Sequence, residues 1–152
     1  MTPRVSIVSP NRNAWSETFI ANHIAHLPGV HLTLTDGHLP KRDIEGEQLL
    51  APTLLKRVVQ RVRKADPQEL LRGTIVRLLK KHRIEVVLAE YGPTGEAMLD
   101  VCNRAGVPLV VHFHGIDAFH TRLLKENWNY QRIFKSPAAI VVVSPEMDHQ
   151  LL

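Results

Sequence analysis

The sequence predicts an α/β fold: a doubly wound, Rossmann-like parallel sheet that spans residues 1–152 as one domain. Short apolar runs, such as VSIVS at residues 5–9, alternate with stretches whose apolar residues recur at helical spacing. The runs are rich in β-branched residues and nearly continuous, as in strands that are covered on both faces. A chain of 152 residues with 44% apolar and 22% charged residues is long enough for one domain with a substantial core.

The first third of the chain is predicted to form two strands and a helix. Residues 5–9 form the first strand, and a polar stretch then leads to a helix that Asn13 or Ser16 caps. The apolar face of this helix consists of Phe19, Ile20, Ile24 and Leu27. Residues 30–35 (VHLTLT) form a second strand, and residues 38–53 form a long surface loop, a type that is usually functional or mobile.

The remaining elements follow from the same patterns. Helices are expected at residues 54–65, 68–82, 96–105 and 120–135, and strands at residues 85–90, 109–113 and 138–143. Residues 91–95 (YGPTG) are expected to form a turn. Ser144, Pro145 and Glu146 suit the N-cap, first position and first-turn acid of a last helix. That helix runs about two turns with no C-cap, which is typical of a chain cut inside a larger protein.

Composition favours a cytoplasmic location. The sequence has no apolar stretch of the length that a membrane span needs, and its start lacks the pattern of a signal peptide. Cys102 is the single cysteine, so disulfides and thiolate metal clusters are not expected, which fits a reducing compartment.

Positive charge is concentrated in one segment. Residues 54–83 hold ten Lys or Arg and two acidic residues, a net charge of +8, while the rest of the chain carries −4. Arg57, Arg61, Arg63 and Lys64 surround the apolar stripe of the helix at 54–65. They form either a solvated face or a membrane-facing surface for the anionic inner leaflet, which would make the protein peripheral. Nucleic acid is disfavoured, because this segment contains no aromatic residue for base stacking.

The best candidate site is the turn His114-Gly115-Ile116-Asp117. It follows the buried strand at 109–113, and ligands bind at the carboxyl edge of open α/β sheets. His112 and His114 share one face of the strand and could hold a metal, but no third ligand stands at a recognisable spacing. We therefore expect His112 to be a hydrogen-bonded interior residue and His114 to project into the cleft, where an imidazole can contact sugar hydroxyls.

Two other segments are weaker candidates. Ser16, Glu17 and Thr18 either cap their helix or line a cleft at the sheet edge. Gly92 and Gly95 either make a tight turn or let backbone amides approach an anionic ligand. The sequence contains no GxGxxG dinucleotide fingerprint.

Four segments carry a resemblance to a known family: SETFI, AEYGPTG, PLVVHFHGIDAF and AAIVVVSPEMDHQL. In this order they resemble the N-terminal half of GT-B-fold glycosyltransferases. The chain is most similar to the retaining, family-four enzymes of bacterial polysaccharide assembly, such as those of colanic acid and amylovoran. In that family the N-terminal domain mainly holds the acceptor. The donor-binding signature, two glutamates eight positions apart with a nearby Arg and Lys, belongs to the C-terminal domain and is absent from these residues.

The resemblance implies roles for particular residues. His114 would be the catalytic residue beside the transferring sugar, and Gly115 and Asp117 would shape its turn. The remaining substrate-binding residues would be Ser16, Glu17 and Thr18 on the acceptor side, Gly92 and Gly95 on the inner wall of the cleft, and Glu90 and Ser144. The resemblance also implies transfer from a nucleotide-sugar to a saccharide or lipid-linked acceptor, with retention and with neither metal nor cofactor. The 152-residue chain alone would be inactive, because it lacks the C-terminal GT-B domain.

Two other classes of function remain open from the sequence. One is a non-catalytic Rossmann-like half-domain that works with a partner chain and would show an exposed apolar face. The other is a nucleotide-dependent α/β enzyme of different chemistry, such as a sugar epimerase, which would bind free nucleotide.

Overall fold

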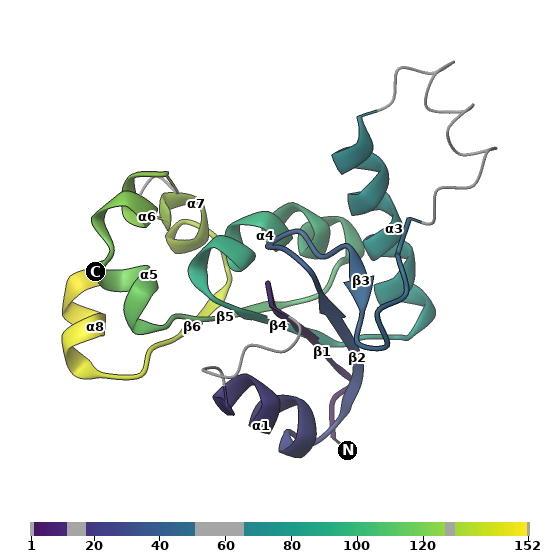
Figure 1. Cartoon of the computed structure of the whole chain (residues 1–152), viewed down its shortest axis with the longest axis horizontal. Coiled ribbons are helices and arrows are strands. Elements are labelled where there is room, and N and C mark those ends of the chain that lie inside the picture. The colour runs from purple at the N-terminus through teal and green to yellow at the C-terminus, as the bar shows by residue number, and fades with distance from the viewer. Residues whose placement is uncertain (1, 12–17, 51–65, 127–129, 152) are drawn as a thin grey trace.

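The computed structural model describes residues 2–11, 18–50, 66–126 and 130–151, and these residues contain one six-stranded sheet of order β3-β2-β1-β4-β5-β6 (Figure 1). The strands are β1 (Val5–Val8), β2 (Val30–Thr35), β3 (Arg42–Asp43), β4 (Val86–Glu90), β5 (Leu109–His112) and β6 (Ala139–Val141). Neighbouring strands are parallel except β2 and β3, which are antiparallel. The predicted doubly wound α/β fold is confirmed.

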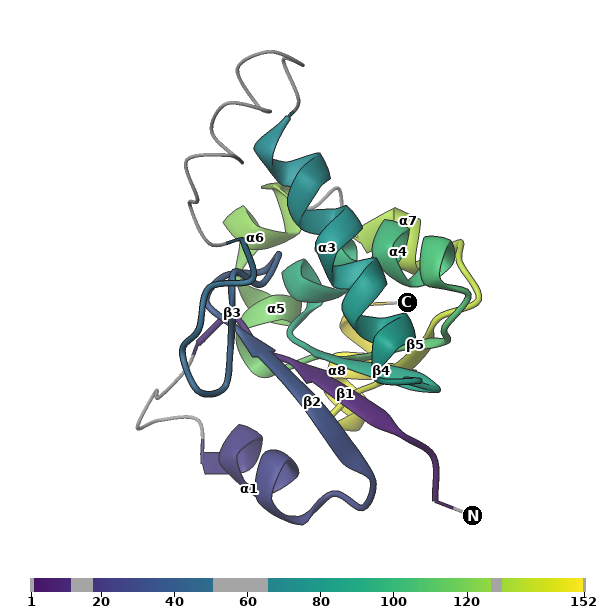
Figure 2. The same cartoon turned by 90° about the vertical axis from the view of Figure 1, so that its right-hand side faces the viewer.

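Helices lie on both faces of this sheet. The described residues form α1 (Thr18–His26), α3 (Pro67–Lys81), α4 (Gly92–Ala105), α5 (Gly115–Phe119), α6 (Thr121–Glu126), α7 (Gln131–Phe134) and α8 (Pro145–Leu151). The helix α1 lies on one face, and α3 and α4 lie side by side on the other (Figures 1 and 2). The elements α5, α6 and α8 gather at the end of the molecule beyond β6, away from α3 (Figure 1).

The core explains why the strands are so apolar. All four residues of β1 are buried, because this strand lies between β2 and β4 and is covered on both faces. On the α3 and α4 side, Ile75, Leu79 and Met98 are fully buried against the sheet. Burying side chains of this size stabilises the fold by about 1.5–3 kcal/mol each.

Local signals set the start of α3. Asp66 is its N-cap and accepts a hydrogen bond from the Gln68 amide at 3.0 Å, with Pro67 in the first turn. Because these signals are explicit in the sequence, the predicted helix at residues 68–82 lies within one residue of α3. The predicted helix at residues 54–65 lies outside the described residues.

The predicted turn at residues 91–95 is wrong, because α4 begins at Gly92. Tyr91, with a φ of 75°, makes the bend between β4 and α4. Pro93 lies in the first turn of the helix, where a missing backbone N–H has no intrahelical partner to lose. A glycine and proline pair here therefore begins a helix.

Three further expectations need correction. The loop predicted at residues 38–53 contains β3, and Arg42 also bridges to Gln48. The single helix predicted at 120–135 is broken, because Tyr130 adopts a left-handed conformation with a φ of 54° before α7. The predicted turn after β5 is the N-cap, His114, and the first turn of α5.

We expect alanine at Gly92 or Gly95 to destabilise the fold. A Cβ on Gly92 would lie 2.6 Å from a Phe113 ring carbon, and one on Gly95 would lie 2.7 Å from the Val111 methyl groups. Overpacking of this kind costs about 1–3 kcal/mol. Gly73→Ala is the matched control, because the nearest neighbour of its Cβ would be the flexible end of Arg77 at 3.7 Å and alanine favours a helix by about 0.5–1 kcal/mol. Chemical denaturation should show opposite signs, and a neutral Gly95→Ala would contradict this packing.

Candidate functional site

A buried carboxylate stands at the carboxyl edge of the sheet. Glu90 ends β4, has no exposed surface and is in register with His112 of β5. Strand order reverses beside it, since β1 has β2 on one side and β4 on the other. In doubly wound folds, ligands bind outside the carboxyl ends of the strands at this switch point.

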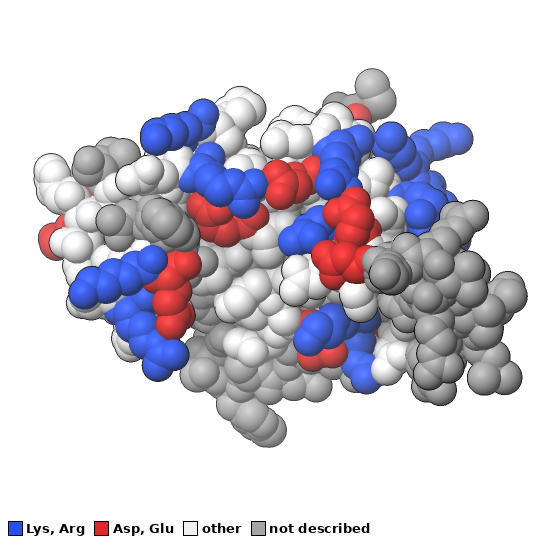
Figure 3. All heavy atoms as spheres, turned by 90° about the horizontal axis from the view of Figure 1, so that it is seen from above, with Lys and Arg blue, Asp and Glu red and all other residues white. Residues whose placement is uncertain are grey.

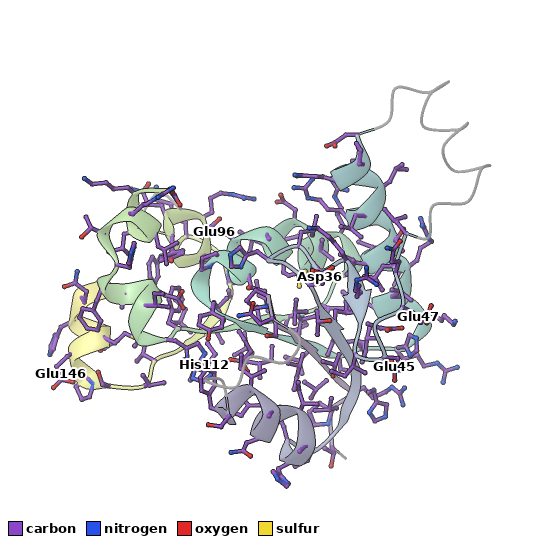
Figure 4. All side chains as sticks on the ribbon, in the orientation of Figure 1. Asp36, Glu45, Glu47, Glu96, His112 and Glu146 are labelled. Carbon is purple, nitrogen blue, oxygen red and sulfur yellow. The ribbon has the colours of Figure 1, made fainter. Side chains whose placement is uncertain are left out.

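Three imidazoles converge on Glu90. His23 Nδ1 lies 2.7 Å from Glu90 Oε1, and Glu90 Oε2 is 3.0 Å from His112 Nδ1 and 3.1 Å from His114 Nε2. We call these four residues the histidine cluster. Its members come from α1, β4, β5 and the N-cap of α5, so the topology alone brings them together. In Figure 4, His112 lies between the end of the sheet and α1.

Aromatic rings enclose the cluster on the α1 side. The His114 ring lies 4.3 Å from that of Phe19 and 4.6 Å from that of Tyr91, measured between centroids. The His112 and His114 rings are 4.3 Å apart. His114 is therefore held in one orientation by ring packing as well as by its hydrogen bond to Glu90.

Glu90 is ionised in this environment. Burial alone would raise its pKa, but hydrogen bonds from His112, His114 and His23, with the charge of His112, outweigh burial and lower the pKa to about 2. The site thus presents a fixed negative charge at neutral pH, and three imidazole rings contact the carboxylate that carries it.

A second carboxylate fixes the turn that carries His114. One oxygen of Asp117 accepts hydrogen bonds from the backbone amides of Gly92 and His114, both at 3.0 Å. This ties the start of α4 to the start of α5. Burial raises the pKa of Asp117 despite these two hydrogen bonds. Burial also raises the pKa of Tyr130, with a further contribution from the charge of Asp117.

The model of the family described as Glycosyltransferase Family 4 matches residues 20–152, which is most of the chain. The chain belongs to this glycosyltransferase family. Comparisons with curated proteins and with solved structures gave no match.

Four of the predicted site residues of this glycosyltransferase chain gather at the sheet edge: Glu90, His114, Gly115 and Asp117. The expectation that His112 is a hydrogen-bonded interior residue is confirmed by its bond to Glu90. His114 does not project freely, because its ring is turned onto Glu90 and only 9% of the residue is exposed. Its contact with a sugar remains a prediction.

The other predicted site residues are placed differently. Gly92 and Gly95 are buried and face core side chains, so packing accounts for them. The Ser144 hydroxyl accepts a hydrogen bond from the Met147 amide at 3.3 Å. Ser144 therefore stands immediately before α8 as its predicted N-cap. Thr18 is exposed at the start of α1. Six further predicted residues lie outside the described residues: Ser16, Glu17 and the four cations predicted to face a membrane, Arg57, Arg61, Arg63 and Lys64.

His23 is a site residue of the glycosyltransferase chain that the sequence prediction missed. It lies four residues after Phe19 on α1, and therefore on the same face of the helix as that apolar residue. Its partner Glu90 ends an apolar strand, and a buried charge needs a partner. These two signals were available in the sequence, but the separation of 67 positions between His23 and Glu90 hides the contact.

The expectation about metal ligands also changes. His23, Glu90 and His112 each place a ligand atom within 4.8 Å of the others. The group that could hold a metal ion therefore differs from the pair His112 and His114 considered in the sequence, and its member His23 comes from α1, which is distant in the sequence.

A pocket lies elsewhere in this glycosyltransferase chain, between β3 and α3. Its volume is about 380 Å³, and its lining includes Asp36, Lys41, Arg42 and Gln68. Asp36, which follows β2, and Arg42 of β3 form an ion pair at 3.2 Å.

The helices that the structure describes include no candidate for a membrane span, because none combines the required length with sufficient apolar character.

Proposed function

We propose that this chain is the acceptor-side N-terminal domain of a GT-B glycosyltransferase of bacterial polysaccharide biosynthesis, of the colanic acid and amylovoran type. The whole enzyme transfers a sugar from a nucleotide-sugar to a saccharide or lipid-linked acceptor, with retention of configuration. The observation that carries the proposal is the family match over residues 20–152, joined to an oriented imidazole at the carboxyl edge of the sheet.

His114 serves transfer by positioning the sugar and does not act as a nucleophile. Glu90 holds its Nε2, and Asp117 holds its backbone amide, so the ring keeps one orientation when substrate arrives. Orientation of this kind lowers the barrier without a covalent step. The leaving diphosphate is stabilised by cationic side chains and helix dipoles, largely those of the C-terminal domain. Neither a metal nor a cofactor is needed for this chemistry.

The test is sugar transfer by the full-length protein with a panel of nucleotide-sugars and a lipid-linked saccharide acceptor. We expect a product whose anomeric configuration, read by NMR, equals that of the donor, and a rate that EDTA leaves unchanged. A product of inverted configuration, or loss of transfer in EDTA, would contradict the proposed mechanism. Binding of free nucleotide to the isolated domain would favour the epimerase alternative instead.

The basic segment supports a cytoplasmic enzyme that is peripheral at the inner face of the membrane. Over the described residues on the face in Figure 3, basic and acidic side chains are interspersed. Glu69, for example, pairs with Arg104 and approaches Arg72. The membrane proposal therefore depends on Arg57, Arg61, Arg63 and Lys64.

Replacing these four cations with glutamine is expected to reduce sedimentation with anionic liposomes strongly, because each cation contributes about 1 kcal/mol at such a surface. The control is the loss of four cations elsewhere, at Arg122, Lys125, Arg132 and Lys135. That variant should sediment like the wild type. Equal sedimentation of both variants and the wild type would remove the membrane proposal.

An exposed apolar surface favours a second candidate, a half-domain that requires a partner. Ile116 and Phe119 of α5 and Val141 and Val143 at the β6 edge are exposed. Either the C-terminal GT-B domain or a separate chain would cover them. Size-exclusion chromatography of the native protein with light scattering distinguishes the two, since a separate chain would add a second polypeptide to the complex.

A further inference from the structure

We propose that three members of the histidine cluster, His23, Glu90 and His112, bind a first-row transition metal ion of the Zn²⁺ class. Imidazole nitrogen and carboxylate oxygen are the donors that such ions prefer. The proposed transfer reaction does not require this ion, so the metal site stands independently of it.

The spacing of the donor atoms suits a four-coordinate ion. Ligands about 2.0–2.1 Å from a tetrahedral zinc ion lie about 3.4 Å from one another. The Nδ1 atoms of His23 and His112 lie 2.7 and 3.0 Å from the oxygens of Glu90, and the three ligand atoms all lie within 4.8 Å of one another. Modest side-chain adjustments would bring these atoms to the spacing that the ion requires.

Three members of the cluster fulfil the geometric condition for a shared ion. The ligand atoms of His23, Glu90 and His112 all lie within 4.8 Å of one another. His114 Nε2 contacts the same carboxylate oxygen as His112 but is not a member of this group, so the fourth position is open to water or another ligand. The donors are anchored on separate elements, which limits how far the site can collapse or spread.

Charge and access also favour a cation. Glu90 is fully buried, and a buried carboxylate is costly unless hydrogen bonds or a cation compensate it. The His23 side chain is 32% exposed, so an ion can reach the cluster from the α1 side. The rings of Phe19 and Tyr91 pack against His114 beside the site, and an apolar shell of this kind controls the access of solvent to a metal.

The test is titration of the purified full chain, free of any affinity tag, with Co²⁺ as a spectroscopic probe. We expect one equivalent to bind with the intense visible absorption of tetrahedral cobalt, and Zn²⁺ to displace it. His23→Ala should weaken binding about 10–100-fold. This variant is decisive because His23 is the most exposed member and its loss leaves the Glu90 pairs with His112 and His114 in place.

Matched controls are His31→Ala and His149→Ala, which remove exposed imidazoles away from the cluster and should bind Co²⁺ like the wild type. Circular dichroism checks that each variant is folded. Absence of a one-to-one complex, a weak octahedral spectrum, or unchanged affinity in folded His23→Ala would overturn the proposal.

Discussion

Replacing His114 with alanine in the full-length enzyme is expected to lower kcat about 10²–10³-fold, the size of the effect when one preorganised hydrogen-bond donor is removed from an active site. The chain should still fold, because Asp117 bonds the backbone amide of residue 114, which alanine retains. Product formation under saturating donor and acceptor measures kcat.

The control for this change is His149→Ala on α8, an exposed imidazole outside the cluster, which should leave kcat unchanged. Circular dichroism and a thermal melt separate a loss of function from a loss of structure. Wild-type turnover in a folded His114→Ala enzyme would end the assignment of a role in transfer to this residue.

Replacing Glu90 with glutamine is expected to lower both stability and turnover. The carboxylate oxygens of Glu90 accept from three imidazoles, and glutamine would turn an amide N–H₂ toward at least one of them. Leaving buried partners unsatisfied costs about 1–3 kcal/mol. Turnover should fall as well, since His114 loses the group that fixes its ring. Urea denaturation and initial rates measure the two effects.

The difference in the free energy of unfolding between the wild type and Glu90→Gln should depend on pH. The pKa of Glu90 is lowered from 4.5 to about 2 in the folded state. Its ionised form therefore stabilises the fold fully above pH 4.5, by roughly 3 kcal/mol as an upper bound, and this contribution is lost as the pH falls toward 2. The gap between wild type and Glu90→Gln should shrink between pH 4.5 and 2. A gap that stays constant over this range would contradict the assignment of the low pKa.

Strands and the well-capped helix could be predicted because their signals are local. The runs that became β1 and β4 are mostly apolar, the run that became β2 alternates between apolar and polar residues, and Asp66 with Pro67 marks the start of α3. The start of α4 could not be predicted in this way. Gly92 and Pro93 are typical turn residues, and the bend comes from the positive φ of Tyr91, which has no sequence signature.

The site was predicted only in part, for a similar reason. The placement of His114, Gly115 and Asp117 followed from one strand and its exit, which are contiguous in sequence. Recognising the full cluster needed the position of α1 over the sheet edge, which depends on tertiary packing. Glu90 was named from the resemblance, but its bonds to three imidazoles became visible only when His23 was placed beside it.

The most direct test of the central claim, that Glu90 serves sugar transfer through His114, is the turnover of the double variant Glu90→Gln with His114→Ala. If Glu90 acts by orienting the imidazole, the double variant should turn over as slowly as His114→Ala alone, because residues in contact have non-additive effects. Losses that multiply in the folded double variant would show that the two residues act independently and would contradict this account.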